Sequence, residues 1–241
     1  KKELANWENL EFWVDYNHHN TITPIDVIPF AGTGNNGIHF GFLTDFGLIE
    51  NLEKAPIVCI APSYDPPINI VAKDIRQFLS FVAYCEQSSL LADIYENEKA
   101  FELRKNQYLE WQMEEKHVIK RKKTIELLNK EFGIKKDNKI ISKINAFKKE
   151  REKIISTETS DGIGLMLKND EKVSDFEYNK DLKKVKEFLD KSNLNSRLKF
   201  YRESTFKYIL TDDYDKEIKK LVVEYLKKDG FKRESEIITK L

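Results

Sequence analysis

The stretch DVIPFAGTGNNGIHFGFLTD, residues 26–45, predicts a β-hairpin on which the rest of the fold is built. In its second half, Ile38, Phe40 and Phe42 alternate along a strand, so they share one face, which we expect to be buried. The two apolar runs are separated by Asn-Asn-Gly, which ends at Gly37. Asparagine and glycine tolerate the positive φ that a tight turn requires, so this spacing favours two paired antiparallel strands.

Two short motifs in the same region resemble nucleotide-site signatures. Residues 32–37 match G-x-G-x-x-G, but a dinucleotide site requires a helix directly after these glycines, and here an alternating strand pattern follows. Residues 45–47 spell Asp-Phe-Gly, yet the other kinase motifs are missing from the sequence. We therefore interpret both as turns.

The composition predicts a folded protein with no bias toward polyanionic partners. The 241 residues include 15 Phe, 10 Tyr and 3 Trp, enough apolar side-chain surface for a substantial core. Lys and Arg number 41, as do Asp and Glu, so the formal net charge is zero. A nucleic-acid or membrane-surface protein usually carries a basic excess, so both partners are judged unlikely at this level.

The distribution of residue types divides the chain near residue 86. All six prolines precede residue 68, and residues 1–85 have a net charge of −5, whereas the remainder has +5. We predict an α+β domain with an antiparallel-rich sheet and flanking helices over residues 1–86. A charged, mainly α-helical region is expected over residues 87–241.

Individual elements follow from local signals. Residues 57–61 and 69–72 are expected to form strands, and Asp74 to cap a helix with Gln77 as its reciprocal partner. Before the hairpin, the spacing of Trp7, Leu10 and Val14 predicts a short helix. Residues 101–132 are expected to form one long helix that ends at Gly133.

The cysteines and histidines suggest neither a disulfide nor a metal site. Cys59 and Cys85 are expected to be free thiols, and the four histidines lack metal-ligand spacing, so no metal and no cofactor is predicted. No apolar run is long enough to span a membrane, and the N-terminal residues do not resemble a signal peptide. We expect a cytoplasmic protein.

The hairpin resembles the central hairpin of the SUKH superfamily, which comprises yeast cell-wall assembly regulators and bacterial toxin-immunity proteins. A following strand-like run at residues 55–62 and a helix-like run at residues 72–79 extend the resemblance over about residues 7–85. The resemblance implies a non-enzymatic interaction protein, in particular a bacterial immunity protein that neutralises a toxin by stoichiometric binding. The alternative within the family is a cytoplasmic regulatory scaffold for cell-wall assembly.

This implied function places the partner-binding residues in the acidic loops, where they would attract a basic toxin. The candidates are Asp15, Tyr16, Asn35, Asn36, Asp45, Tyr64 and Asp65. No catalytic residue is assigned.

Two further hypotheses remain open at the sequence level. One is a hydrolase or transferase that uses His39 or Asp45. The other is a scaffold whose charged helices, around Trp111 and residues 120–123, dock a partner protein or a nucleic acid.

Overall fold

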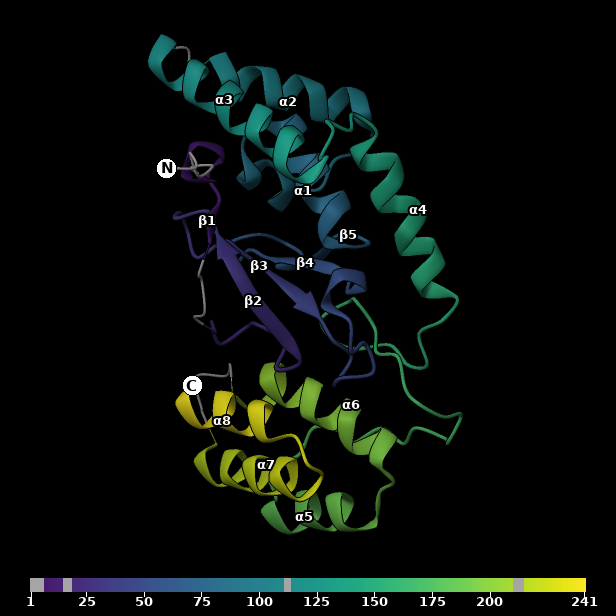
Figure 1. Ribbon diagram of the computed structural model, residues 1–241. Helices are drawn as coiled ribbons and strands as arrows, with labels where there is room; N and C mark the ends of the chain where they lie inside the picture. Colours follow the sequence, from purple (N-terminus) through teal and green to yellow (C-terminus); the bar gives the residue numbers. More distant parts are fainter. Residues whose placement is uncertain (1–6, 15–18, 111–113, 210–214) are drawn as a thin grey trace. The chain divides into compact units, whose positions relative to one another are not determined.

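The computed structural model describes residues 7–14, 19–110, 114–209 and 215–241, and these form a mixed α+β structure (Figure 1). The chain divides into two compact units. The first unit comprises residues 1–17, 29–42 and 51–151, and the second unit comprises residues 18–28, 43–50 and 152–241. This division does not coincide with the predicted boundary at residue 86, because several helices that follow residue 86 pack with the sheet in the first unit.

A five-stranded sheet has the order β1-β2-β3-β4-β5, in which every strand lies next to its neighbour in sequence. The pairs β1–β2, β3–β4 and β4–β5 are antiparallel. The strands are β1 (Trp13–Val14), β2 (Val27–Gly32), β3 (His39–Leu43), β4 (Ile57–Ile60) and β5 (Ile68–Ala72).

The predicted hairpin is confirmed. Asn36 and Gly37 have φ values of 51° and 68°, the left-handed conformation for which Asn and Gly are suited. The Thr33 N–H donates to the Ile38 carbonyl at 3.0 Å, which closes the turn between β2 and β3. Pro29 lies in β2 outside the two-residue pairing with β1, so its missing N–H costs no hydrogen bond on that side.

The helices of the first unit cover the sheet and extend beyond it. They are η1 (Trp7–Leu10), η2 (Leu52–Lys54), α1 (Ile75–Cys85), η3 (Ser88–Ala92), α2 (Glu98–Glu110), α3 (Glu115–Phe132) and α4 (Ile140–Glu152).

The predicted cap of α1 is confirmed, since the Gln77 N–H donates to Asp74 Oδ1 at 2.7 Å. Gly133 also ends α3 in the left-handed conformation, as predicted. The single helix expected over residues 101–132 is wrong, because the structure has two helices there, α2 and α3. The short N-terminal helix is also only partly right: Val14 lies in β1 rather than in a helix, with half of its surface exposed.

Aromatic rings fill the first core. Phe78 of α1 packs 4.8 Å from Phe40 and 5.9 Å from Phe30, and the rings of Phe30 and Phe42 lie 4.5 Å apart. The predicted burial of the Phe40 face is therefore confirmed. The opposite face of β3 is buried as well, including His39, which a half-buried hairpin would have left in solvent.

The second unit is built mainly from helices with their own core. They are α5 (Leu182–Lys191), α6 (Leu194–Ser204), the π-helix η4 (Thr205–Ile209), α7 (Lys216–Lys228) and α8 (Lys232–Lys240). Apolar side chains from α5, α6 and α7 meet in one cluster, to which Ile25 and Phe46 also contribute. None of the helices that the structure describes is long and apolar enough to cross a membrane.

Candidate functional site

A pocket of about 270 Å³ opens on the first unit. Four parts of the chain form it: the β2–β3 turn, the loop after β4, the segment around η3, and α2. The residues that line it are Asn35, Asn36, Ile38, Tyr64, Ser89, Leu90, Asp93, Arg104 and Tyr108. Most of these side chains are polar or aromatic, a composition that suits recognition of a polar group more than of an apolar ligand.

The β2–β3 turn places Asn35 and Asn36 in the lining of the pocket. Gly34 has φ +75°, and a Cβ at this position would lie 2.9 Å from Nε1 of Trp13, so a side chain would collide with the indole. The Asn35 N–H donates to Thr33 Oγ1 at 3.3 Å, which adds a second constraint within the turn. Asn35 and Asn36 are exposed in this turn.

The charged groups of the pocket form a loose pair. Arg104 Nε lies 4.0 Å from Asp93 Oδ2, and about a third of the Asp93 side chain and almost half of the Arg104 side chain remain exposed. The Tyr95 hydroxyl also donates to Asp93 Oδ2, at 3.4 Å. A pair with this separation and exposure leaves both charges able to bind an incoming group.

The tyrosines of the pocket stay protonated at neutral pH. Burial raises the pKa of Tyr64, and the Asp93 carboxylate raises it further. Burial also raises the pKa of Tyr108, with an added contribution from the Glu11 carboxylate. The phenol groups therefore remain hydrogen-bond donors, and their rings offer apolar surface beside the carboxylate.

The structure brings together three of the seven predicted contact residues, since Asn35, Asn36 and Tyr64 line the same pocket. Asp65 is exposed in the Tyr64 loop but does not line the pocket. Asp15 and Tyr16 lie outside the described residues.

The other six residues that line the pocket were not predicted as contact residues: Ile38, Ser89, Leu90, Asp93, Arg104 and Tyr108. Arg104 and Tyr108 follow the expected boundary and belong to α2, where an i, i+4 spacing places them on one helix face. That spacing was the sequence signal from which their position on the same helix face could have been predicted.

The prediction that Asp45 contacts a partner is wrong, because its side chain is only 2% exposed. Asp45 Oδ1 accepts a hydrogen bond from the Met166 N–H at 3.2 Å. It belongs to a buried charge cluster of the second unit, which consists of Asp26, Asp45, Asp161 and Arg202. A carboxylate buried in this way cannot touch a docking protein.

The buried charge cluster is centred on Arg202, which is 1% exposed. Its Nη1 lies 2.8 Å from Asp26 Oδ2, and its Nε lies 2.5 Å from Asp161 Oδ2. Burial raises the pKa of Asp26 to about 6, against the opposing effect of the Arg202 guanidinium. Three carboxylates around one cation carry an excess of negative charge, which protonation of Asp26 reduces.

The residues of the hydrolase hypothesis are both buried. His39 lies in β3 with no exposed surface, and its Nδ1 is 2.7 Å from the Gly37 carbonyl. Asp45 belongs to the buried charge cluster. A substrate in solution therefore has no direct access to either side chain in this conformation.

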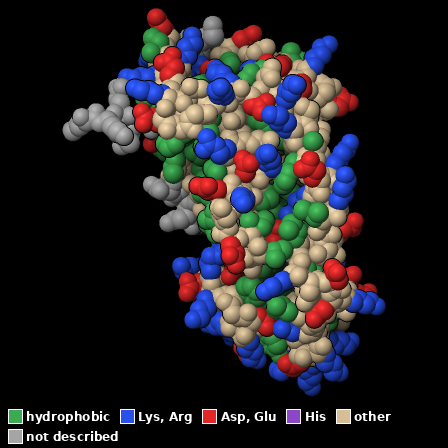
Figure 2. All heavy atoms as spheres, turned by 45° about the vertical axis from the view of Figure 1, so that its right-hand side comes forward, with side chains coloured by type: hydrophobic (Ala, Val, Ile, Leu, Met, Phe, Trp, Pro, Cys, Tyr) green, Lys and Arg blue, Asp and Glu red, His purple; other side chains and the backbone are tan. Residues whose placement is uncertain are grey.

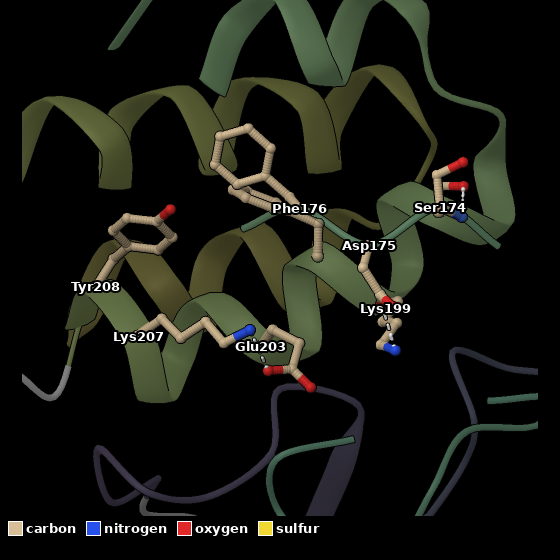
Figure 3. Close-up of a pocket in the computed structure, with 9 residues that line it drawn as sticks. Ser174, Asp175, Phe176, Lys199, Glu203, Lys207 and Tyr208 are labelled. Carbon is tan, nitrogen blue, oxygen red and sulfur yellow. Dashed lines mark hydrogen bonds and ion pairs between the residues drawn. The ribbon is translucent and has the colours of Figure 1, made fainter. Parts of the chain in front are cut away.

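A second, much smaller pocket lies on the second unit and has a volume of about 20 Å³ (Figure 3). Its charged groups are already paired: Lys199 Nζ is 2.5 Å from Asp175 Oδ1, and Lys207, which extends toward Glu203 in Figure 3, lies 2.9 Å from its Oε2. The volume suits about one water molecule. The larger pocket of the first unit is thus the better candidate for binding.

The thiols offer no reactive group near either pocket. Cys59 and Cys85 are free and buried, and burial raises the pKa of both far above neutrality, so both stay in the unreactive thiol form. Within the described ranges, no group of three or more His, Cys, Asp or Glu side chains is arranged to hold a metal ion.

Comparison with known proteins adds no relative: no family model matches the chain, and no curated protein matches it. The structure by itself defines an α+β protein with an antiparallel five-stranded sheet and two separate cores. Its function has to be inferred from the pocket and from the arrangement of charge.

Proposed function

We propose that this protein works by stoichiometric binding of a partner protein, as a bacterial immunity protein of SUKH type that neutralises a basic toxin. The pocket of the first unit supports the proposal, because it gathers Asn35, Asn36 and Tyr64 with two further anchor-type side chains, Arg104 and Tyr108. Tyrosine and arginine in partly desolvated pockets are the residues that most often dominate protein interfaces.

The size of the pocket favours a protein side chain over a cofactor. Sites for small molecules usually occupy about 300–1,000 Å³ and are mostly apolar. This pocket has about 270 Å³ and a largely polar lining. One or two side chains of a partner would fill it.

The charge of the first unit favours a basic side chain of the partner as the group that enters the pocket. Outside the segment of residues 115–151, the first unit carries 8 Lys and Arg against 14 Asp and Glu. Within the pocket, the Asp93 carboxylate lies close enough to Tyr64 to raise the pKa of its hydroxyl. A cation between a carboxylate and an aromatic face gains both an ion pair and a cation–π contact.

The test is binding to the protein encoded beside its gene. We expect a 1:1 complex and protection of cells that express that protein. Tyr64→Ala and Asp93→Asn should each weaken the complex about 30-fold, the effect of losing one hot-spot residue of about 2 kcal/mol. Isothermal titration calorimetry gives the affinity, and growth in co-expression gives the protection.

Matched controls separate the pocket from general effects. Tyr178→Ala removes an exposed tyrosine of the second unit, and Glu96→Gln removes an exposed carboxylate of the first unit. Both should bind like the unchanged protein. Absence of a complex together with absence of protection would count against the proposal, as would equal losses in the pocket variants and the controls. A complex without protection would favour the regulatory scaffold instead.

A further inference from the structure

The zero net charge of the whole chain conceals a basic segment in the first unit. Residues 115–151, which form α3, the connection and all of α4 except its last residue, Glu152, contain 13 Lys and Arg but only 5 Asp and Glu. The remainder of the same unit is acidic. The expectation that disfavoured nucleic acid rested on the zero total and on the glutamates, such as Glu126 and Glu131, that lie among these cations.

Several of these cations have no acidic partner. Lys136 pairs with Glu86 and Lys143 with Asp137, while the Arg121 side chain is 4% exposed. Six other lysines of the segment are accessible and make no ion pair with any residue that the structure describes. We call them the lysine surface: Lys120, Lys122, Lys130, Lys135, Lys139 and Lys149.

The fold keeps this surface in solvent. Thr124, Ile125 and Leu128 turn one face of α3 into the core, so Lys120, Lys122 and Lys130 lie on the exposed side of the helix. A helix of 18 residues is about 27 Å long, and the remaining lysines continue from it through the connection into α4. In Figure 2, many Lys and Arg side chains (blue) project from the upper part of the molecule, where α3 and α4 lie.

We propose that the lysine surface binds the phosphodiester backbone of a nucleic acid without reading its sequence. Unpaired lysines along a helix release counterions from a polyanion, which is the main source of nonspecific affinity. Protein interfaces, in contrast, are depleted in lysine. A membrane-bound amphipathic helix would need a free apolar face, and that face of α3 is already occupied, since Ile125 and Leu128 are buried.

The experiment measures binding of the full chain to fluorescein-labelled 20-nucleotide probes by anisotropy between 50 and 200 mM salt. Single-stranded DNA, duplex DNA and duplex RNA serve as separate arms. We expect a Kd on the order of 10⁻⁶ M at the low-salt end and a steep loss of affinity with salt. Lys120→Ala, Lys122→Ala and Lys130→Ala combined should weaken binding about tenfold or more and reduce the salt slope by about two.

The triple variant should fold normally, because alanine is the best helix former and these side chains are exposed. A control with Lys183→Ala, Lys184→Ala and Lys227→Ala changes the net charge equally on exposed positions of the second unit, and should bind like the unchanged protein. Equal losses in the two variants would overturn the proposal, because binding would then follow net charge alone. It would also fail if no probe binds, or if the protein binds phosphatidylserine vesicles and no nucleic acid.

Discussion

Arg202→Met is expected to destabilise the second unit by about 3–5 kcal/mol at pH 7, the usual cost of removing one partner from a buried ion pair. Arg202 donates to both Asp26 and Asp161, and all three side chains are buried. Methionine fills a similar volume but leaves the carboxylates without their cation. Urea unfolding would give the free energy, and hydrogen exchange of the α6 amides would localise the loss to this unit.

Two further variants make the result specific. Arg202→Met combined with Asp26→Asn and Asp161→Asn removes the two carboxylates that Arg202 contacts and leaves only Asp45 charged, so much of the lost stability should return. Lys186→Met breaks an ion pair with Asp190 whose side chains are both at least half exposed, and should leave the unfolding midpoint nearly unchanged. An Arg202→Met protein within about 1 kcal/mol of the original would show that the buried charge cluster does not stabilise the fold.

The hairpin could be predicted because its requirements are local. Positive φ at Asn36 and Gly37 is a property of a few consecutive residues, and so is the cap that Asp74 provides for α1. In both cases the residue types that satisfy the backbone leave a signature in the sequence itself.

Helix α6 could not be found in the same way, because it has no clean apolar stripe. It buries Asn195, Ser196, Arg202 and Glu203 along with its apolar residues. These polar side chains are tolerated inside because distant segments supply their partners, as Asp26 does for Arg202 across 176 positions. A periodicity of apolar residues does not detect a helix whose buried face is partly charged.

The same long-range pairing explains the outcome for the candidate site. Asp45 follows a strand and lies next to a turn, a position that predicts an exposed side chain. In the structure it is buried, because it belongs to the buried charge cluster. Asn35 and Tyr64 were predicted as contact residues because they lie in loops, whereas Arg104 contributes to the pocket from a helix 40 positions beyond Tyr64. Which loops share a pocket depends on the packing of α2, and linear order does not contain that information.

The stability of the second unit is expected to decrease as the pH rises from about 4 to 7, through the titration of Asp26. Its folded pKa of about 6 lies above the ordinary value of 3.8, so the folded state holds the proton more tightly than the unfolded state. The contribution of this proton to the free energy of unfolding is fully present below pH 3.8 and is lost as the pH rises through 6. It amounts to about 3 kcal/mol. The charges that face Asp26 are Arg202, Asp45 and Asp161.

Asp26→Asn isolates this titration, because asparagine keeps the shape of the protonated carboxyl group but cannot ionise. We therefore compare the urea midpoints of Asp26→Asn and the unchanged protein between pH 4 and pH 7. As the pH rises, the midpoint of the unchanged protein should fall steadily relative to that of the variant. Asp170→Asn, which alters an exposed carboxylate of the same unit, should show no such change. A pH-independent difference for Asp26→Asn would mean that Asp26 is already ionised at pH 4, and that Arg202 outweighs the effect of burial.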